Sequence, residues 1–242
     1  MLPISIRPAI LCLALALPVS PVQAGGMKVG PILVNLGADA QTSVLTLENS
    51  GTSPSLIQLQ LVEWTAPKGE DEYKPSQDIV VTPPIFTLQP GHPQIVRVGI
   101  NRDPHPEREL AYRLFIEEVP PPPKPGQQGL QIALRLSVPI FVQAPKASQH
   151  AVRWRATEGP GHSITLKATN DGNKHARLQA ITLRATASDK VIASLQPAAY
   201  LLPGQTRKWV IPAKEALPTA RLRLAAEYDG GAIDANLDVE AE

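Results

Sequence analysis

The sequence predicts an all-β protein built as two β-sandwich domains. Turn-forming residues are abundant and scattered, with 26 prolines and 16 glycines among 242 residues. The runs between them alternate apolar and polar residues, as half-buried strands do, and 43% of all residues are hydrophobic. Sustained helical periodicity occurs only near the N-terminus. This hydrophobic content favours a packed core over disorder.

The first 24 residues are typical of an export signal. Arg7 supplies a positive charge, Ala9 to Leu17 form a short apolar segment, and Ala24 precedes the expected cleavage point. The apolar segment is too short to anchor the chain in a bilayer. We therefore expect an exported, soluble mature protein of about 218 residues, long enough for two domains.

The signal also contains Cys12, the single cysteine of the chain, so we expect no disulfide in the mature protein. The whole chain has a formal net charge of +1, and loss of Arg7 brings the mature chain to about zero. A nucleic-acid partner needs a concentrated basic surface, which this charge balance does not indicate.

The first predicted domain covers residues 25–145. Its runs have apolar residues on one face and polar residues on the other, as Ile57, Leu59 and Leu61 show against Gln58 and Gln60. Seven short strands at this spacing predict an immunoglobulin-like sandwich. The expected strands are Pro31 to Leu36, Thr42 to Glu48, Leu56 to Trp64, Ile79 to Val81, Gln94 to Ile100, Tyr112 to Glu118 and Leu130 to Val142.

The second predicted domain covers residues 146–242 and follows a polar break at 143–150. Two short segments repeat between the halves: Thr46 to Gly51 resembles Thr165 to Gly172, and the Pro-Gly turn after Leu88 resembles the one after Leu202. Such echoes are expected of tandem related sandwiches. The expected strands are Ala151 to Arg155, Ser163 to Thr169, Leu178 to Ala185, Val191 to Ser194, Thr206 to Ile211, Arg221 to Glu227 and Ala232 to Val239.

The last strand of the first domain has the most pronounced pattern. Leu130, Ile132, Leu134 and Leu136 occupy every second position, so a strand places them on one face. An ordinary core strand would look the same. However, this one is long and follows a proline-rich segment at 119–129 that cannot pair regularly with a neighbour. In natural sheets, exposed edge strands are usually short or carry charged side chains. A long apolar edge therefore suggests that this strand functions by pairing with another chain.

Three motifs in this half resemble the periplasmic chaperones of bacterial chaperone–usher pili: Thr82 to Gly91, Ala111 to Pro121, and Leu130 to Leu134. The second motif resembles the divergent branch called archaic. The resemblance implies a boomerang of two immunoglobulin-like domains in the periplasm. Such a chaperone would bind a pilus or surface-fibre subunit without ATP, lend it a strand, and deliver it to an outer-membrane usher. The resemblance leaves open whether the free chaperone covers its apolar edge by self-association.

The resemblance also implies a basic anchor for the C-terminal carboxylate of the subunit. The family's usual basic positions correspond to Leu33 and Pro139, neither of which is basic. We therefore expect Arg113 to hold the carboxylate, because a guanidinium can donate two parallel hydrogen bonds. An ordinary solvated strand residue is the alternative. Glu109 and Asp229 match acidic positions of the family's interdomain contact.

No enzymatic or cofactor motif is evident. The histidines are isolated, which predicts surface or turn positions and no metal site; they are His92, His105, His150, His162 and His175. No nucleotide-binding loop or nucleophile motif is present. The alternative function is an exported adhesive or carbohydrate-binding module. Such a module would need aromatic platforms, whereas Phe, Trp and Tyr make up 4% of the chain.

Overall fold

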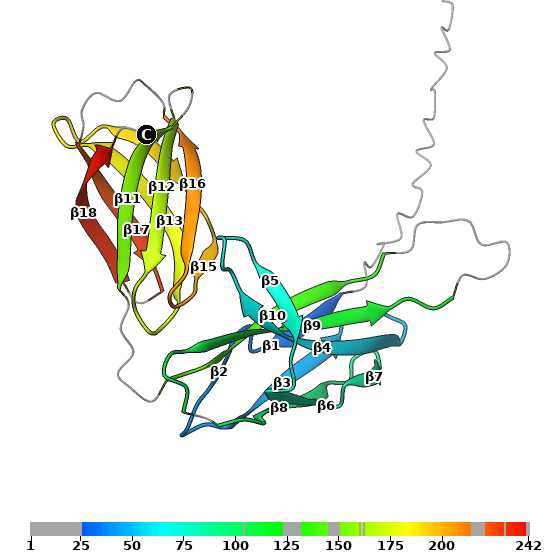
Figure 1. Ribbon diagram of the computed structural model, residues 1–242. Helices are drawn as coiled ribbons and strands as arrows, with labels where there is room; N and C mark the ends of the chain where they lie inside the picture. Colours follow the sequence, from blue (N-terminus) through cyan, green and yellow to red (C-terminus); the bar gives the residue numbers. More distant parts are fainter. Residues whose placement is uncertain are drawn as a thin grey trace, which may run out of the picture.

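The computed structural model describes residues 26–103, 105–122, 132–144, 151–159, 161, 163–213, 221–229 and 231–240. These residues form eighteen strands and no helix, which confirms the all-β prediction. The strands make two sandwiches that meet at an angle, as expected of a boomerang (Figure 1). The predicted domain boundary at residues 145 and 146 lies outside the described residues.

The first sandwich contains β1 to β10 in two sheets. One sheet has the order β1-β3-β8-β6, and the other has the order β2-β10-β9-β4-β5 with β7 also paired to β4. The strand bounds are β1 Met27–Gly30, β2 Val34–Leu36, β3 Thr42–Asn49, β4 Ser55–Thr65, β5 Glu72–Pro75, β6 Ile79–Thr82, β7 Ile85–Leu88, β8 Gln94–Ile100, β9 Leu110–Val119 and β10 Arg135–Val142.

The predicted strand from Pro31 to Leu36 is wrong in its extent. The chain forms β1 before Pro31 and β2 from Val34, and the two strands belong to different sheets: β1 pairs with β3, whereas β2 pairs in parallel with β10. Pro31 has no backbone N–H to donate, so pairing stops there and the chain crosses between sheets. This crossover determines how far β2 covers the edge of β10.

The strand predicted from Leu130 begins only at Arg135. Leu130 lies outside the described residues, and Ile132 to Leu134 are described without being part of the strand. Pairing nevertheless extends one step beyond β10, because the backbone N–H of Glu118 donates to the carbonyl of Leu134 at 2.9 Å. The prediction also lacks the short strands β5 and β7; β5 is exposed along its whole length, so its sequence has no apolar alternation.

The second sandwich contains β11 to β18. Its strands follow the order β14-β13-β17-β18-β11-β12-β16, with β15 paired to β13, and a short parallel contact between β11 and β18 joins the two layers. The strand bounds are β11 Val152–Gly159, β12 Ser163–Asn170, β13 Ala176–Ala185, β14 Val191–Leu195, β15 Ala199–Leu201, β16 Thr206–Pro212, β17 Arg221–Tyr228 and β18 Gly231–Glu240.

Each sandwich has its own apolar core, and a third, smaller cluster joins them. Trp64, Ala111 and Phe141 of the first sandwich pack with Leu202 of the second, and Tyr200 lies against the same group. Trp64 is 2% exposed and belongs to this junction. The apolar contact fixes which faces of the two sandwiches meet. Among the described residues, no helix has the length and apolar character needed to cross a membrane.

Candidate functional site

One edge of β10 is only partly covered. On one side, β9 pairs with the whole of β10, from Arg135 to Val142. On the other side, β2 pairs only with the last three residues, beginning at Ile140. The stretch from Arg135 to Pro139 therefore has an edge that pairs with no strand of the described residues. An uncovered edge presents unpaired backbone N–H and C=O groups to any strand that can reach it.

The apolar side chains along this edge become steadily more exposed toward its N-terminal end. Val138 is buried, Leu136 and Leu134 are half-buried, and Ile132 is 73% exposed. Leu136 still packs on the core of the first sandwich. The alternation predicted from the sequence therefore describes a stripe that begins in the core and runs out of it.

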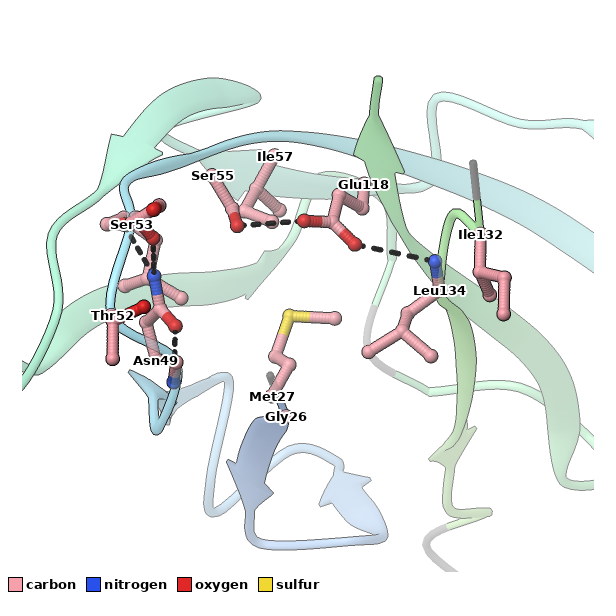
Figure 2. Close-up of a pocket in the computed structure, with 12 residues that line it drawn as sticks. Gly26, Met27, Asn49, Thr52, Ser53, Ser55, Ile57, Glu118, Ile132 and Leu134 are labelled. Carbon is pink, nitrogen blue, oxygen red and sulfur yellow. Dashed lines mark hydrogen bonds between the residues drawn. The ribbon is translucent and has the colours of Figure 1, made fainter. Parts of the chain in front are cut away.

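A pocket of about 430 Å³ opens beside the exposed end of this stripe (Figure 2). Its lining combines the first residues of β1, the β3–β4 turn, and the ends of β4, β7 and β9. Ile132 and Leu134 lie on one side of the pocket and the β3–β4 turn lies on the other, with Met27 between them. The pocket thus lies where the two sheets of the first sandwich separate.

Glu118 gives the pocket a polar side. Its Oε1 accepts a hydrogen bond from the Ser55 hydroxyl at 2.6 Å, and its Oε2 accepts one from the backbone N–H of Leu134 at 3.4 Å. Figure 2 shows this chain of contacts between β4, β9 and the approach to β10. Glu118 therefore ties Leu134 to the sheet just ahead of the strand.

Arg113 lies on the face of β9 that turns toward the second sandwich. It is opposite Pro139 of β10 in the sheet register. Its guanidinium lies 3.8 Å from the centre of the Trp64 ring and 5.3 Å from that of Tyr200. Burial lowers the pKa of Arg113, and within the described residues its buried Nε has no hydrogen-bond partner. The ring faces of Trp64 and Tyr200 thus hold the Arg113 guanidinium, and its Nε–H remains available to donate a hydrogen bond.

A second charged group joins the sandwiches beside Arg113. Arg207 of β16 makes an ion pair with Asp71, which precedes β5. The Tyr73 hydroxyl also donates to Asp71, at 3.4 Å. The sequence predicted no role for Asp71, Tyr73 or Arg207, because their proximity depends on how the two sandwiches meet.

Glu109, expected at the interdomain contact, lies there in the structure. Its Oε1 accepts hydrogen bonds from the backbone N–H and the Nδ1 of His175, at 2.9 and 2.6 Å. Both residues are buried, and the His175 ring stacks on Phe141 with centroids 3.7 Å apart. His175 lies in the turn between β12 and β13, which agrees with the predicted surface or turn position, but it is buried there and not exposed. The Glu109 carboxylate thus accepts the two hydrogen bonds that water would accept from an exposed histidine.

The second acidic residue expected at this contact has partners in its own sandwich. Asp229 Oδ1 accepts a hydrogen bond from Gln179 Nε2 at 2.6 Å, and its backbone N–H donates to the carbonyl of Arg177. An interdomain role for Asp229 therefore stays a prediction. In the described residues, no group of three histidine, cysteine, aspartate or glutamate side chains is arranged to hold a metal ion.

Comparison with known proteins identifies the family. Residues 26–148 match the model of the pili and flagellar-assembly chaperones, PapD N-terminal domain. The chain belongs to this family of pilus-assembly chaperones. This assignment disfavours the alternative of an adhesive or carbohydrate-binding module. A search of curated protein sequences found no match.

Several solved structures of chaperones share the whole two-sandwich fold. A chain of the CsuC–CsuE chaperone–tip adhesion subunit complex, from the archaic chaperone-usher Csu pili of Acinetobacter baumannii, is 19% identical. It aligns with a TM-score of 0.65 over 90% of this chain and 99% of its own. The Pseudomonas aeruginosa CupB2 chaperone is 17% identical, with a TM-score of 0.58 and coverage of 88% and 100%.

A third match comes from the Salmonella enterica SafA pilin in complex with the SafB chaperone. It is 18% identical, with a TM-score of 0.59, and covers 88% of this chain and 94% of its own. The second sandwich, which the family model does not reach, is therefore also part of the shared fold.

Proposed function

We propose that this pilus-assembly chaperone works in the periplasm by donor-strand complementation. It pairs the open edge of β10 with an incomplete pilus or surface-fibre subunit and fills the subunit's groove with the apolar stripe. It then delivers the subunit to an outer-membrane usher. Leu130, Ile132, Leu134 and Leu136 are the donor residues, of which Leu130 lies outside the described part of the chain.

The observation that carries this proposal is the combination of an open backbone edge with exposed apolar side chains on the same segment. Ile132 is 73% exposed although it continues the alternation of a core strand. Burying one such side chain contributes about 1.5–3 kcal/mol before ordering costs. Several such contacts and a ladder of backbone hydrogen bonds would stabilise a long-lived complex that another strand could still displace. No nucleotide is needed in this scheme, because folding of the subunit supplies the free energy.

The position of β2 sets the direction in which the bound strand must run. A strand laid along β10 cannot continue past Pro139, because β2 occupies the edge from Ile140 onward. Arg113 lies opposite Pro139 at this end. If the bound strand runs parallel to β10, it ends here with its terminal carboxylate close to the guanidinium. We therefore assign Arg113 the role of carboxylate anchor.

The fold likeness to a chaperone structure from archaic Csu pili supports placing this chain in the archaic branch. Two of the matched structures are complexes of a chaperone with a tip adhesion subunit and with a pilin. These complexes support a fibre subunit as the partner of this chain. The export signal at residues 1–24 supports the periplasmic location. Self-association of the free chaperone would cover the exposed stripe in the absence of a subunit.

Capture of a subunit tests the proposal. The tagged chain is co-expressed with a candidate subunit encoded beside it, and the amount of subunit that co-purifies from the periplasm is measured. The wild type is compared with an Ile132→Arg, Leu134→Arg double variant, in which two charged side chains replace apolar donor residues. We expect capture by the wild type and at least about a tenfold loss in the double variant.

Val210→Arg is the matched control, because Val210 is also a strongly exposed apolar residue, at 62%, but lies on the second sandwich. Circular dichroism checks that all variants remain folded. Equal capture by the wild type and the double variant would contradict strand donation, as would a failure of both to capture the subunit.

A further inference from the structure

The Arg113 site contains a second arginine that comes from the other sandwich. Arg207 of β16 is largely buried, with 17% of its side chain exposed, and its ion pair with Asp71 crosses from one sandwich to the other. The turn that carries Asp71 lies directly against β16: a Cβ added to Gly69 would be 3.0 Å from the carbonyl oxygen of Thr206. The β16 backbone that carries Arg207 is therefore packed closely against the turn that carries Asp71.

Arg113, Arg207 and Asp71 share one electrostatic environment. Burial is the main cause that lowers the pKa of Arg113; the nearby Asp71 acts in the opposite direction, and Arg207 adds to the lowering. Tyr73 and Tyr200 lie beside the same guanidinium and also oppose the lowering. Each of these charges is thus close enough to act on the others.

This cluster has more cationic capacity than its own carboxylate satisfies. Arg207 pairs with the carboxylate of Asp71, and the same carboxylate acts on Arg113, whereas each of the two guanidinium groups has five N–H donors. Within the described residues, the buried Nε atoms of both Arg113 and Arg207 have no hydrogen-bond partner. One further carboxylate would balance the charge and use the free donors, which in a half-buried site contribute more than in water.

We propose that Arg207 is the second cation of the subunit-carboxylate site. In the free protein, Asp71 pairs with Arg207 and takes the place that the subunit's carboxylate would have. When the terminal carboxylate of a subunit reaches Arg113, Arg207 shares it and the contact to Asp71 weakens. The bound carboxylate then joins β9 of the first sandwich to β16 of the second. This inference rests on the proposed strand donation and on the anchoring role of Arg113.

The test uses a fluorescent peptide of alternating valine and threonine that ends in a free carboxylate, and the same peptide as a C-terminal amide. Fluorescence anisotropy gives the dissociation constant of each, and the ratio of amide to acid measures carboxylate recognition alone. For the wild type we expect the acid to bind about tenfold more tightly than the amide. Arg207→Gln should reduce this ratio to about threefold, and Arg113→Gln to about one.

Asp71→Asn provides an independent arm that leaves Arg207 in place. It removes the competing carboxylate, so the ratio should rise above the wild-type value by about threefold. Arg223→Gln is the control, because Arg223 makes an exposed ion pair with Asp234 and lies opposite Arg184, toward the end of β13 that is farther from His175 and the junction. Its ratio should equal that of the wild type.

The outcomes separate this inference from the proposal on which it rests. If Arg113→Gln abolishes the ratio while Arg207→Gln and Asp71→Asn leave it unchanged, Arg113 is the anchor and the role of Arg207 is overturned. If the wild type does not distinguish acid from amide, or does not bind the peptide, the anchor itself is overturned. A ratio that falls in Asp71→Asn would show that Asp71 supports the site, and would also overturn the inference.

Discussion

Glu109 and His175 form a buried hydrogen-bonded pair that joins the two sandwiches, with 2.6 Å between Oε1 and Nδ1. The backbone N–H of Glu109 also donates to the carbonyl of Asn173, so the β12–β13 turn is held to the start of β9 by three hydrogen bonds. Phe141 stacks on the imidazole and excludes water from the pair. The angle between the sandwiches therefore depends on this polar contact, because water cannot reach the site to replace its hydrogen bonds.

Replacement of Glu109 should loosen this junction. Glu109→Ala leaves two buried donors of His175 without an acceptor, and loss of one partner from a buried pair costs about 3 kcal/mol. We expect a corresponding fall in the free energy of unfolding, measured by denaturant titration with tryptophan fluorescence. Glu107→Gln, at an exposed position two residues earlier, is the control and should unfold like the wild type.

Two asparagines hold equivalent turns in the two sandwiches. Asn49 Nδ2 donates to the carbonyls of Ser53 and Leu88, at 2.8 and 3.1 Å. Asn170 Nδ2 donates in the same way to Lys174 and Leu201, at 2.7 and 2.9 Å. In both cases the Oδ1 accepts the backbone N–H two residues later. Each side chain thus ties the end of one strand to a distant strand in its own sandwich.

The Asn170→Ala substitution should destabilise the second sandwich by about 2–4 kcal/mol, because it leaves the carbonyls of Lys174 and Leu201 and the backbone N–H of Gly172 without their hydrogen-bond partner. Asn49→Ala should have a comparable effect on the first sandwich. Thermal unfolding followed by circular dichroism measures both. Asn236→Ala, in the exposed strand β18, serves as the control. A change below about 0.5 kcal/mol in both asparagine variants would contradict the proposed equivalence.

The sequence echo between Thr46 to Gly51 and Thr165 to Gly172 predicts related turns, but its alignment is wrong. Matching Thr46 to Thr165 puts Asn49 opposite Ala168, whereas the hydrogen bonds make Asn170 its counterpart. The stretch ending at Asn170 is two residues longer before the turn. Hydrogen bonds identify equivalent positions more reliably than short sequence similarities, because the bonds depend on the geometry of the fold.

The fold class, and most strands longer than six residues, could be predicted because their signal is local. Alternation within β4 or within β10 requires only the residues of that strand. The contacts at the junction could not be predicted in this way. Glu109 and His175 are 66 residues apart, and Asp71 and Arg207 are 136 apart. Nothing near His175 indicated burial, and only the packing of one sandwich on the other brings these partners together.

Tyr112 should make the protein sensitive to alkaline pH. Its hydroxyl donates to Asp78 Oδ2 at 2.7 Å, and burial, followed by this hydrogen bond, raises its pKa well above the ordinary tyrosine value of about 10. The folded state therefore keeps its proton after the unfolded state has lost it. This contribution to stability is complete below pH 10 and is lost as pH rises above it.

Tyr112→Phe isolates this effect. Near pH 7 the variant should be less stable by about 1–2 kcal/mol, since it lacks a hydrogen bond to a carboxylate. Between pH 10 and 11 the wild type should lose up to about 1.4 kcal/mol more than the variant, so the two should converge. Denaturant titrations at each pH measure this difference. Parallel curves over that range would contradict the assignment.

Gly69 lies in the β4–β5 turn, which also carries Asp71 toward the second sandwich, and its backbone requires glycine. Its N–H donates to the carbonyl of Ala66 at 3.0 Å, and its φ of +84° is one that side chains rarely adopt. In Gly69→Ala, the new Cβ would also lie 3.0 Å from the backbone oxygen of Thr206. The variant therefore combines a local conformational cost with a collision between the sandwiches.

Gly91→Ala separates these two effects. Gly91 also has a positive φ, of +68°, but a Cβ there would meet nothing within 4 Å. We expect Gly91→Ala to lower the free energy of unfolding by about 1 kcal/mol and Gly69→Ala to lower it by about 2–3 kcal/mol. The additional loss in Gly69→Ala reflects a shift of the turn away from β16, and denaturant titration measures both losses. Equal losses of stability in the two variants would mean that the turn does not hold the sandwiches together.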